Sequence, residues 1–244
     1  MSRKVMAPMD PTAAIPPAWT SVLAVIAHPD DASSGIGSVL DAFIFAGARV
    51  EVLCLTHRQA WTLHDAPGDL ATLRGSELAS AADVLGPIRA TTQDHPDGTL
   101  GPQRRTKMAT EVVAVADSCH PDGLLVFDAA EVSGHLDHVA ATSAGLLAAE
   151  TLNVPVLGWT FSDTVAAQLN QEFAAGPAAH QGEQVDLRVS LERTRQRVAS
   201  HADSRHTSPG SAQWRRLQLL ADTGSLRWLR PPSGRRPGQV SQPQ

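Results

Sequence analysis

The chain has 244 residues and a formal net charge of −5, and its residues are 42% hydrophobic and 18% charged. This balance indicates a globular protein whose length suits one large α/β domain. It excludes the strongly basic field of a typical nucleic-acid binder, and no stretch of the sequence reaches the roughly 20 apolar residues of a membrane span.

Two cysteines, Cys54 and Cys119, are too few for a disulfide framework or a cysteine-based zinc site. Pro and Asp interrupt the N-terminal segment, which therefore makes a poor signal peptide, and we expect a cytoplasmic protein. Residues 1–18 are interpreted as a flexible arm, and residues 230–244, rich in Pro, Gly and Arg, as a disordered tail. The expected domain covers residues 19–229.

Within that domain, short apolar runs alternate with longer amphipathic stretches. Strands are expected at residues 21–27, 49–56, 88–92, 123–128 and 154–160. Helices are expected at residues 35–46, 70–85, 105–118, 137–152, 191–201 and 212–221. The segment 161–184 is interpreted as a lid or a disordered loop. The alternation predicts an α/β fold with a Rossmann-like, mostly parallel sheet flanked by helices, whose active site lies at the carboxyl ends of the strands.

Two polar motifs fall directly after predicted strands. HPDD, at residues 28–31, follows the first strand, and GHLDH, at residues 134–138, follows the strand at 123–128. Imidazole and carboxylate ligands suit zinc, and three protein ligands with an open fourth position are typical of a catalytic site. His28 and Asp31 lie across a tight turn that can aim both side chains at one point. Either His135 or His138 can complete such a ligand set.

Asp30 stands beside these ligands without a required ligand role, so its carboxylate can take a proton from a water activated by the cation. Each motif alone could instead begin a helix, with Asp31 capping the helix that starts at Gly35. Two such motifs after neighbouring strands favour the metal site.

The two motifs and their order along the chain resemble the PIG-L/LmbE-like family of metal-dependent N-acetylglucosaminyl deacetylases. The resemblance covers roughly residues 20–205. It is carried by AHPDDASSGIG (27–37), LTHR (55–58), LRGSELASAADVLG (73–86), DHPDGTL (94–100), VFDAAEVSGHLDHVAATSAG (126–145) and VDLRVSLERTRQRVASHADS (185–204).

The resemblance implies a specific role for each matching residue. One divalent cation, expected to be Zn²⁺, would be bound by His28, Asp31 and His138, with Asp30 as the general base. His135 would steady the oxyanion or protonate the leaving amine, and Asp137 would orient His135. The expected substrate-binding residues are Arg74, Asp97 and His201. The expected partner is a small N-acetyl-sugar conjugate rather than a nucleic acid.

The sequence also departs from the family pattern. Ala32 and Ser33 replace a glutamate that usually follows the paired aspartates, Leu136 replaces a proline, and the chain contains no tyrosine to donate to an oxyanion. The loop after the second strand lacks the usual glycine near Arg58. These departures keep two alternatives open: a non-catalytic metal-binding member of the fold, and a metal-dependent hydrolase of another amide.

Overall fold

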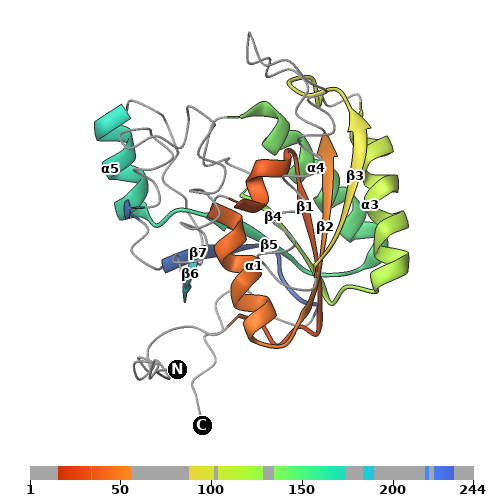
Figure 1. Ribbon diagram of the computed structural model, residues 1–244, viewed down its shortest axis with the longest axis horizontal. Helices are drawn as coiled ribbons and strands as arrows, with labels where there is room; N and C mark the ends of the chain where they lie inside the picture. Colours follow the sequence, from red (N-terminus) through yellow and green to blue (C-terminus); the bar gives the residue numbers. More distant parts are fainter. Residues whose placement is uncertain are drawn as a thin grey trace, which may run out of the picture.

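The computed structural model describes residues 16–33, 35–56, 88–101, 104–128, 135–173, 184–189, 218–219 and 223–233. These residues form one sheet with helices on both faces (Figure 1). The predicted α/β, Rossmann-like fold is therefore confirmed. Within the described ranges, every helix is too short or too polar to cross a membrane.

Seven strands make up this sheet, and six of them run in the same direction. In spatial order they are β3 (Arg89–His95), β2 (Arg49–Thr56), β1 (Ser21–Ile26), β4 (Gly123–Phe127), β5 (Val156–Thr160), β7 (Thr223–Arg230) and β6 (Gln184–Arg188). The strands from β3 to β5 pair in parallel, whereas β7 pairs antiparallel with both β5 and β6. The strand order reverses between β1 and β4, and ligands of such sheets bind in the crevice beyond the carboxyl ends of those strands.

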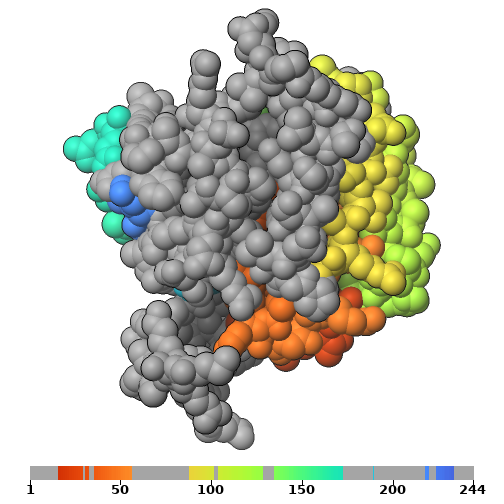
Figure 2. Space-filling model, in the orientation of Figure 1, coloured from red at the N-terminus to blue at the C-terminus, as the bar shows by residue number. Residues whose placement is uncertain are grey.

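Alternate side chains of the strands build two hydrophobic layers. The helices that cover them are α1 (Gly35–Phe45), α3 (Arg105–Cys119), α4 (Leu136–Leu152) and α5 (Asp163–Phe173). Val22, Ala24 and Ile26 of β1 belong to the layer of α1 and α5, while Leu23 and Val25 belong to the layer of α3 and α4. Figure 2 shows α1 along the lower edge of the front face and β3 with α3 along one flank. These five apolar side chains of β1 are fully buried, as in a parallel strand covered on both faces.

Both edges of the sheet differ from the sequence prediction. β3 continues to His95, beyond the predicted end at residue 92, and residues 163–173 form helix α5 where the sequence predicts a lid or a disordered loop. The sequence does not predict β6 or β7, because arginines interrupt the apolar pattern of β7. The structure gives both arginines distant hydrogen-bond partners: Arg227 donates to Asp128, and Arg230 donates to Asn153. The predicted helices at 70–85 and 191–201, and most of the one at 212–221, lie outside the described residues.

Trp19 fixes the start of the domain to the sheet. Its ring stacks on Phe43 of α1, with centroids 5.5 Å apart, and meets Trp228 of β7 edge-on.

A Cβ on Gly123, at the start of β4, would lie 2.4 Å from the Trp19 ring. We expect Gly123→Ala to lower the free energy of unfolding by about 1–3 kcal/mol through overpacking, as measured by chemical denaturation. A Trp19→Ala background should remove most of this loss, and an equal loss in both backgrounds would contradict the contact.

Candidate metal centre

His28 and Asp31 are placed by the turn that ends β1. The strand stops at Ile26, and a short 3-10 helix, η1, spans Pro29–Ser33. The Oδ2 atom of Asp31 accepts the backbone N–H groups of Ala27 at 3.1 Å and His28 at 2.8 Å. These hydrogen bonds close the turn on the Asp31 carboxylate, and His28 and Asp31 are both more than 90% buried.

His138 reaches the same point from the first turn of α4. Its Nε2 atom lies 3.0 Å from Oδ1 of Asp31. The imidazole stacks flat on the ring of Phe127, the last residue of β4, with centroids 4.1 Å apart and planes 3° from parallel. Trp159 of β5 meets Phe127 edge-on, so an aromatic pair from two strands fixes the plane of the histidine ring.

The donor atoms of His28, Asp31 and His138 all lie within 4.8 Å of one another, and all three residues are buried. Two imidazoles and one carboxylate form the kind of ligand set that suits zinc, and three protein ligands leave room for water or substrate. A second set, made of His28, His135 and Asp137, satisfies the same distance but includes the exposed His135. The residues present therefore fit a divalent cation, and the first set is the better enclosed.

The two ring nitrogens of His28 face different groups. Nδ1 lies 3.8 Å from Oδ2 of Asp31, another member of the buried triad. Nε2 lies 3.0 Å from Oδ1 of Asp97 and 3.3 Å from Oδ2 of Asp137. An Nε2–H that donates to these carboxylates leaves the lone pair of Nδ1 for a cation, because a neutral imidazole carries one proton.

Asp137 holds a loop as well as a histidine. Its Oδ2 atom accepts the backbone N–H of Gly98 at 2.7 Å, and its Oδ1 atom accepts that of Leu100 at 2.9 Å. The resemblance implies that Asp137 orients His135, but here the two residues are joined through the Asp137 backbone N–H, which donates to Nδ1 of His135 at 3.2 Å. The carboxylate itself engages the loop and His28.

Two pKa values are moved by this environment. Burial alone would raise the pKa of Asp31, but His138 and His28 outweigh it and lower that pKa to about 2. The pKa of His135 is lowered, first by burial of part of its ring and then by the neighbouring His28 and His138. Asp31 is therefore an anionic donor at neutral pH, and His135 is a neutral imidazole there.

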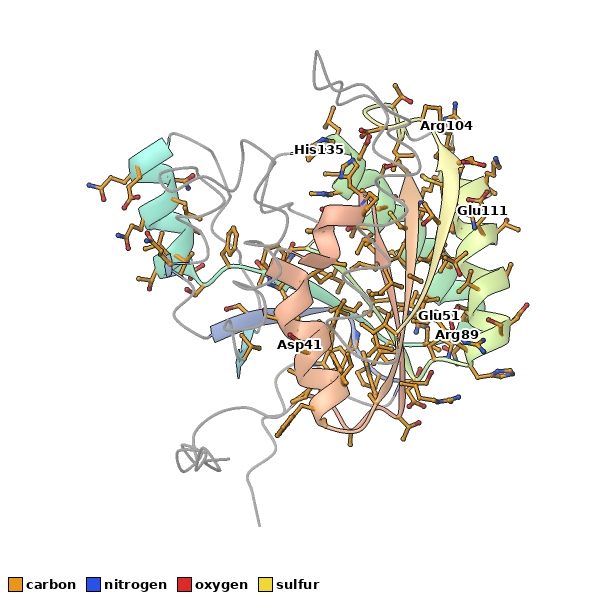
Figure 3. The ribbon with its side chains drawn as sticks, viewed as in Figure 1. Asp41, Glu51, Arg89, Arg104, Glu111 and His135 are labelled. Atoms are coloured by element: carbon orange, nitrogen blue, oxygen red, sulfur yellow. The ribbon has the colours of Figure 1, made fainter. Side chains whose placement is uncertain are left out.

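The structure brings most of the predicted site residues together. His135 is the N-cap of α4, with its ring centroid 4.7 Å from that of His28 and 5.2 Å from that of His138. Figure 3 shows it at the end of the sheet to which β2 and β3 point, away from Glu51 and Arg89. The backbone of Asp30 lies in η1, whereas its side chain, Arg74 and His201 lie outside what the structure describes.

Sequence reasoning misses two features near the centre. The first is Phe127, which stacks on His138. The sequence signal for this contact is that Phe127 is the last apolar residue of the strand before GHLDH. The second is the buried carboxylate of Asp128, which accepts a hydrogen bond of 2.6 Å from Nη2 of Arg227 on β7. Nothing local marks this pair, because the residues stand 99 positions apart.

The sequence model of the PIG-L family, the GlcNAc-PI de-N-acetylases, matches residues 23–149, which is more than half of the chain. The chain belongs to the PIG-L family. Both polar motifs and the whole buried triad lie inside the matched range. The family resemblance of the sequence is thereby confirmed.

Two bacterial relatives of this PIG-L family protein are both named 1D-myo-inositol 2-acetamido-2-deoxy-alpha-D-glucopyranoside deacetylase. The one from Kineococcus radiotolerans is 28% identical over 50% of this chain and 43% of its own length. The one from Mycolicibacterium vanbaalenii is 25% identical over 59% of this chain and 60% of its own length. The match therefore spans less than two thirds of either relative.

Among solved structures, the A40926 pseudoaglycone deacetylase Dbv21 has a similar fold. The TM-score is 0.69 at 20% sequence identity, and the alignment covers 86% of this chain and 96% of that one. At this identity the likeness supports the fold of this PIG-L family protein.

Proposed function

We propose that this PIG-L family protein is a zinc-dependent deacetylase that hydrolyses the acetamide of an N-acetyl-sugar conjugate. The observation that carries the proposal is the buried triad of His28, Asp31 and His138 at the carboxyl ends of β1 and β4. Family membership and the two relatives named for an acetamido-sugar substrate support the type of bond and the class of substrate.

The ligand atoms would be Nδ1 of His28, a carboxylate oxygen of Asp31 and Nε2 of His138. When bound, the cation would polarise the acetamide carbonyl and make a water molecule more acidic. Before any cation is bound, Asp31 is already anionic, because its pKa is lowered to about 2, and the ring of His138 is already held by its stacking on Phe127.

Asp30 and His135 would perform the proton chemistry. Asp30 follows His28 by two residues in η1 and takes the proton of the attacking water as general base. Nδ1 of His135 accepts the Asp137 backbone N–H, so the neutral ring carries its proton on Nε2. That Nε2–H is a donor for the oxyanion that forms as the carbonyl is attacked, and the proton taken by Asp30 can pass to the leaving amine.

Substrate recognition is proposed for the residues that the family pattern assigns to the sugar. Arg74 and Asp97 would hold hydroxyl groups, and His201 would approach from the late helix. Leu136 and Val139 add exposed apolar surface beside His135, on the first turn of α4. We therefore expect a sugar conjugate with a mixed polar and apolar surface near the acetamide.

The direct test measures acetate release from N-acetylglucosamine conjugates by the zinc-loaded protein and by Asp30→Asn. We expect the variant to lose about 10²–10⁴-fold in kcat, because general-base catalysis contributes that much, while its zinc content stays unchanged. Asp117→Asn, which alters an exposed carboxylate on α3, should retain full activity.

Other outcomes select the alternatives. A wild-type protein that binds zinc but is as inactive as Asp30→Asn on a broad panel of acetamides would instead be a metal-binding member without catalysis. Turnover of an amide without an acetyl group, lost in Asp30→Asn, would keep the mechanism and change the substrate class.

A further inference from the structure

The loop after β3 comes closer to the metal centre than a substrate-binding role requires. Oδ1 of Asp97 lies 3.0 Å from Nε2 of His28, and the two side chains are 7% and 6% exposed. Oδ1 of Asp97 therefore lies at Nε2 of His28, while the other ring nitrogen of His28, Nδ1, lies nearer to Asp31.

The loop is held in that position from both sides. Before Asp97, the buried His95 bonds through Nε2 to Glu111 of α3 at 2.6 Å. After Asp97, the backbone N–H groups of Gly98 and Leu100 donate to the two oxygens of Asp137. The backbone of Gly98 has a φ of +73°, a value that favours glycine, and this turn lets both N–H groups face one carboxylate.

We propose that Asp97 is a positioning residue for the metal ligand His28. Asp137 holds Asp97 in place by accepting hydrogen bonds from the backbone of the loop after β3. The inference rests on the proposed metal site and goes beyond the sugar contact expected of Asp97. A carboxylate on the outer nitrogen of a metal-bound imidazole fixes the ring and its tautomer and makes the inner nitrogen a stronger donor. Removing it should therefore weaken metal binding before any substrate is present.

The experiment measures zinc affinity without substrate, by competition with a chromophoric chelator. Asp97→Asn keeps an acceptor for Nε2–H but removes the charge, and Asp97→Ala removes both. We expect the affinity to fall by about 10-fold in the first variant and up to about 100-fold in the second, the range found for outer partners of metal ligands. Asp94→Asn, an exposed carboxylate three residues earlier, is the matched control and should bind zinc like the wild type.

Thermal unfolding of the metal-free proteins shows whether each variant is folded, and Asp97→Asn, which differs by one atom type, guards against a folding defect in Asp97→Ala. Zinc affinity within twofold of wild type in both variants, with a raised KM alone, would overturn the inference and leave Asp97 as a sugar contact. That result would leave the proposed deacetylase intact, whereas a wild type that binds no zinc would overturn both proposals.

A double variant tests the part assigned to Asp137. If Asp137→Asn weakens zinc binding partly by releasing the loop, Asp97→Ala should add little in that background. Losses that multiply in full in Asp97→Ala/Asp137→Asn would show that the two carboxylates act on His28 independently, and would overturn the role of Asp137 as the anchor.

Discussion

Asp31→Asn should abolish tight zinc binding, with a loss of at least about 100-fold that exceeds the effect of any outer residue. The Asp31 carboxylate is the anionic member of the triad, since its pKa is lowered to about 2 and it is ionised at neutral pH. An amide in its place can still accept the N–H groups of Ala27 and His28, so the turn after β1 can persist. Chelator competition measures the affinity, and thermal unfolding of the metal-free variant checks the turn.

Two histidine variants decide which ligand set is real. His28 belongs to both candidate sets, but His138 belongs to the buried one and His135 to the exposed one. His138→Gln should therefore lose zinc binding as severely as Asp31→Asn, while His135→Gln should keep zinc and lose turnover. The reverse pattern would move the cation to the set that contains Asp137 and would refute the buried triad.

Arg227→Met should destabilise the protein by about 3–5 kcal/mol, because it removes a cation that pairs with the fully buried Asp128 carboxylate. For a domain of this size the melting temperature should fall on the order of 10 °C. The ion pair connects β4 to β7 across β5, so the loss should appear in global unfolding. Chemical denaturation measures it.

Two comparisons isolate the buried charge as the cause. Arg227→Met/Asp128→Asn removes both charges and should recover much of the stability that Arg227→Met loses. Lys107→Met removes a cation from an exposed pair with Glu111 and should cost less than about 1 kcal/mol. A loss of the same small size for Arg227→Met would mean that water or another group already balances Asp128.

The sequence by itself determines the parallel half of the sheet and the place of the site. The strand predicted at 49–56 is β2 to the residue, and those that precede the two motifs end within one residue of β1 and β4. These elements are predictable because a buried parallel strand needs a continuous apolar run, which is a local property. HPDD and GHLDH follow two such runs, and strands that end at the same sheet edge must bring them together.

The tertiary structure decides which atoms meet at that edge and how the other side of the sheet is completed. The spacing of GHLDH allows either of its two histidines to reach a cation. Only the structure shows that His138 is the one that stacks on Phe127. Asp137 bonds to backbone N–H groups 39 and 37 positions away. In the sequence, Arg227 only interrupts the apolar pattern of a strand, and the structure shows that it pairs with Asp128. Such pairings depend on contacts between distant segments, and a side chain carries no local sign of a partner that only the folded chain supplies.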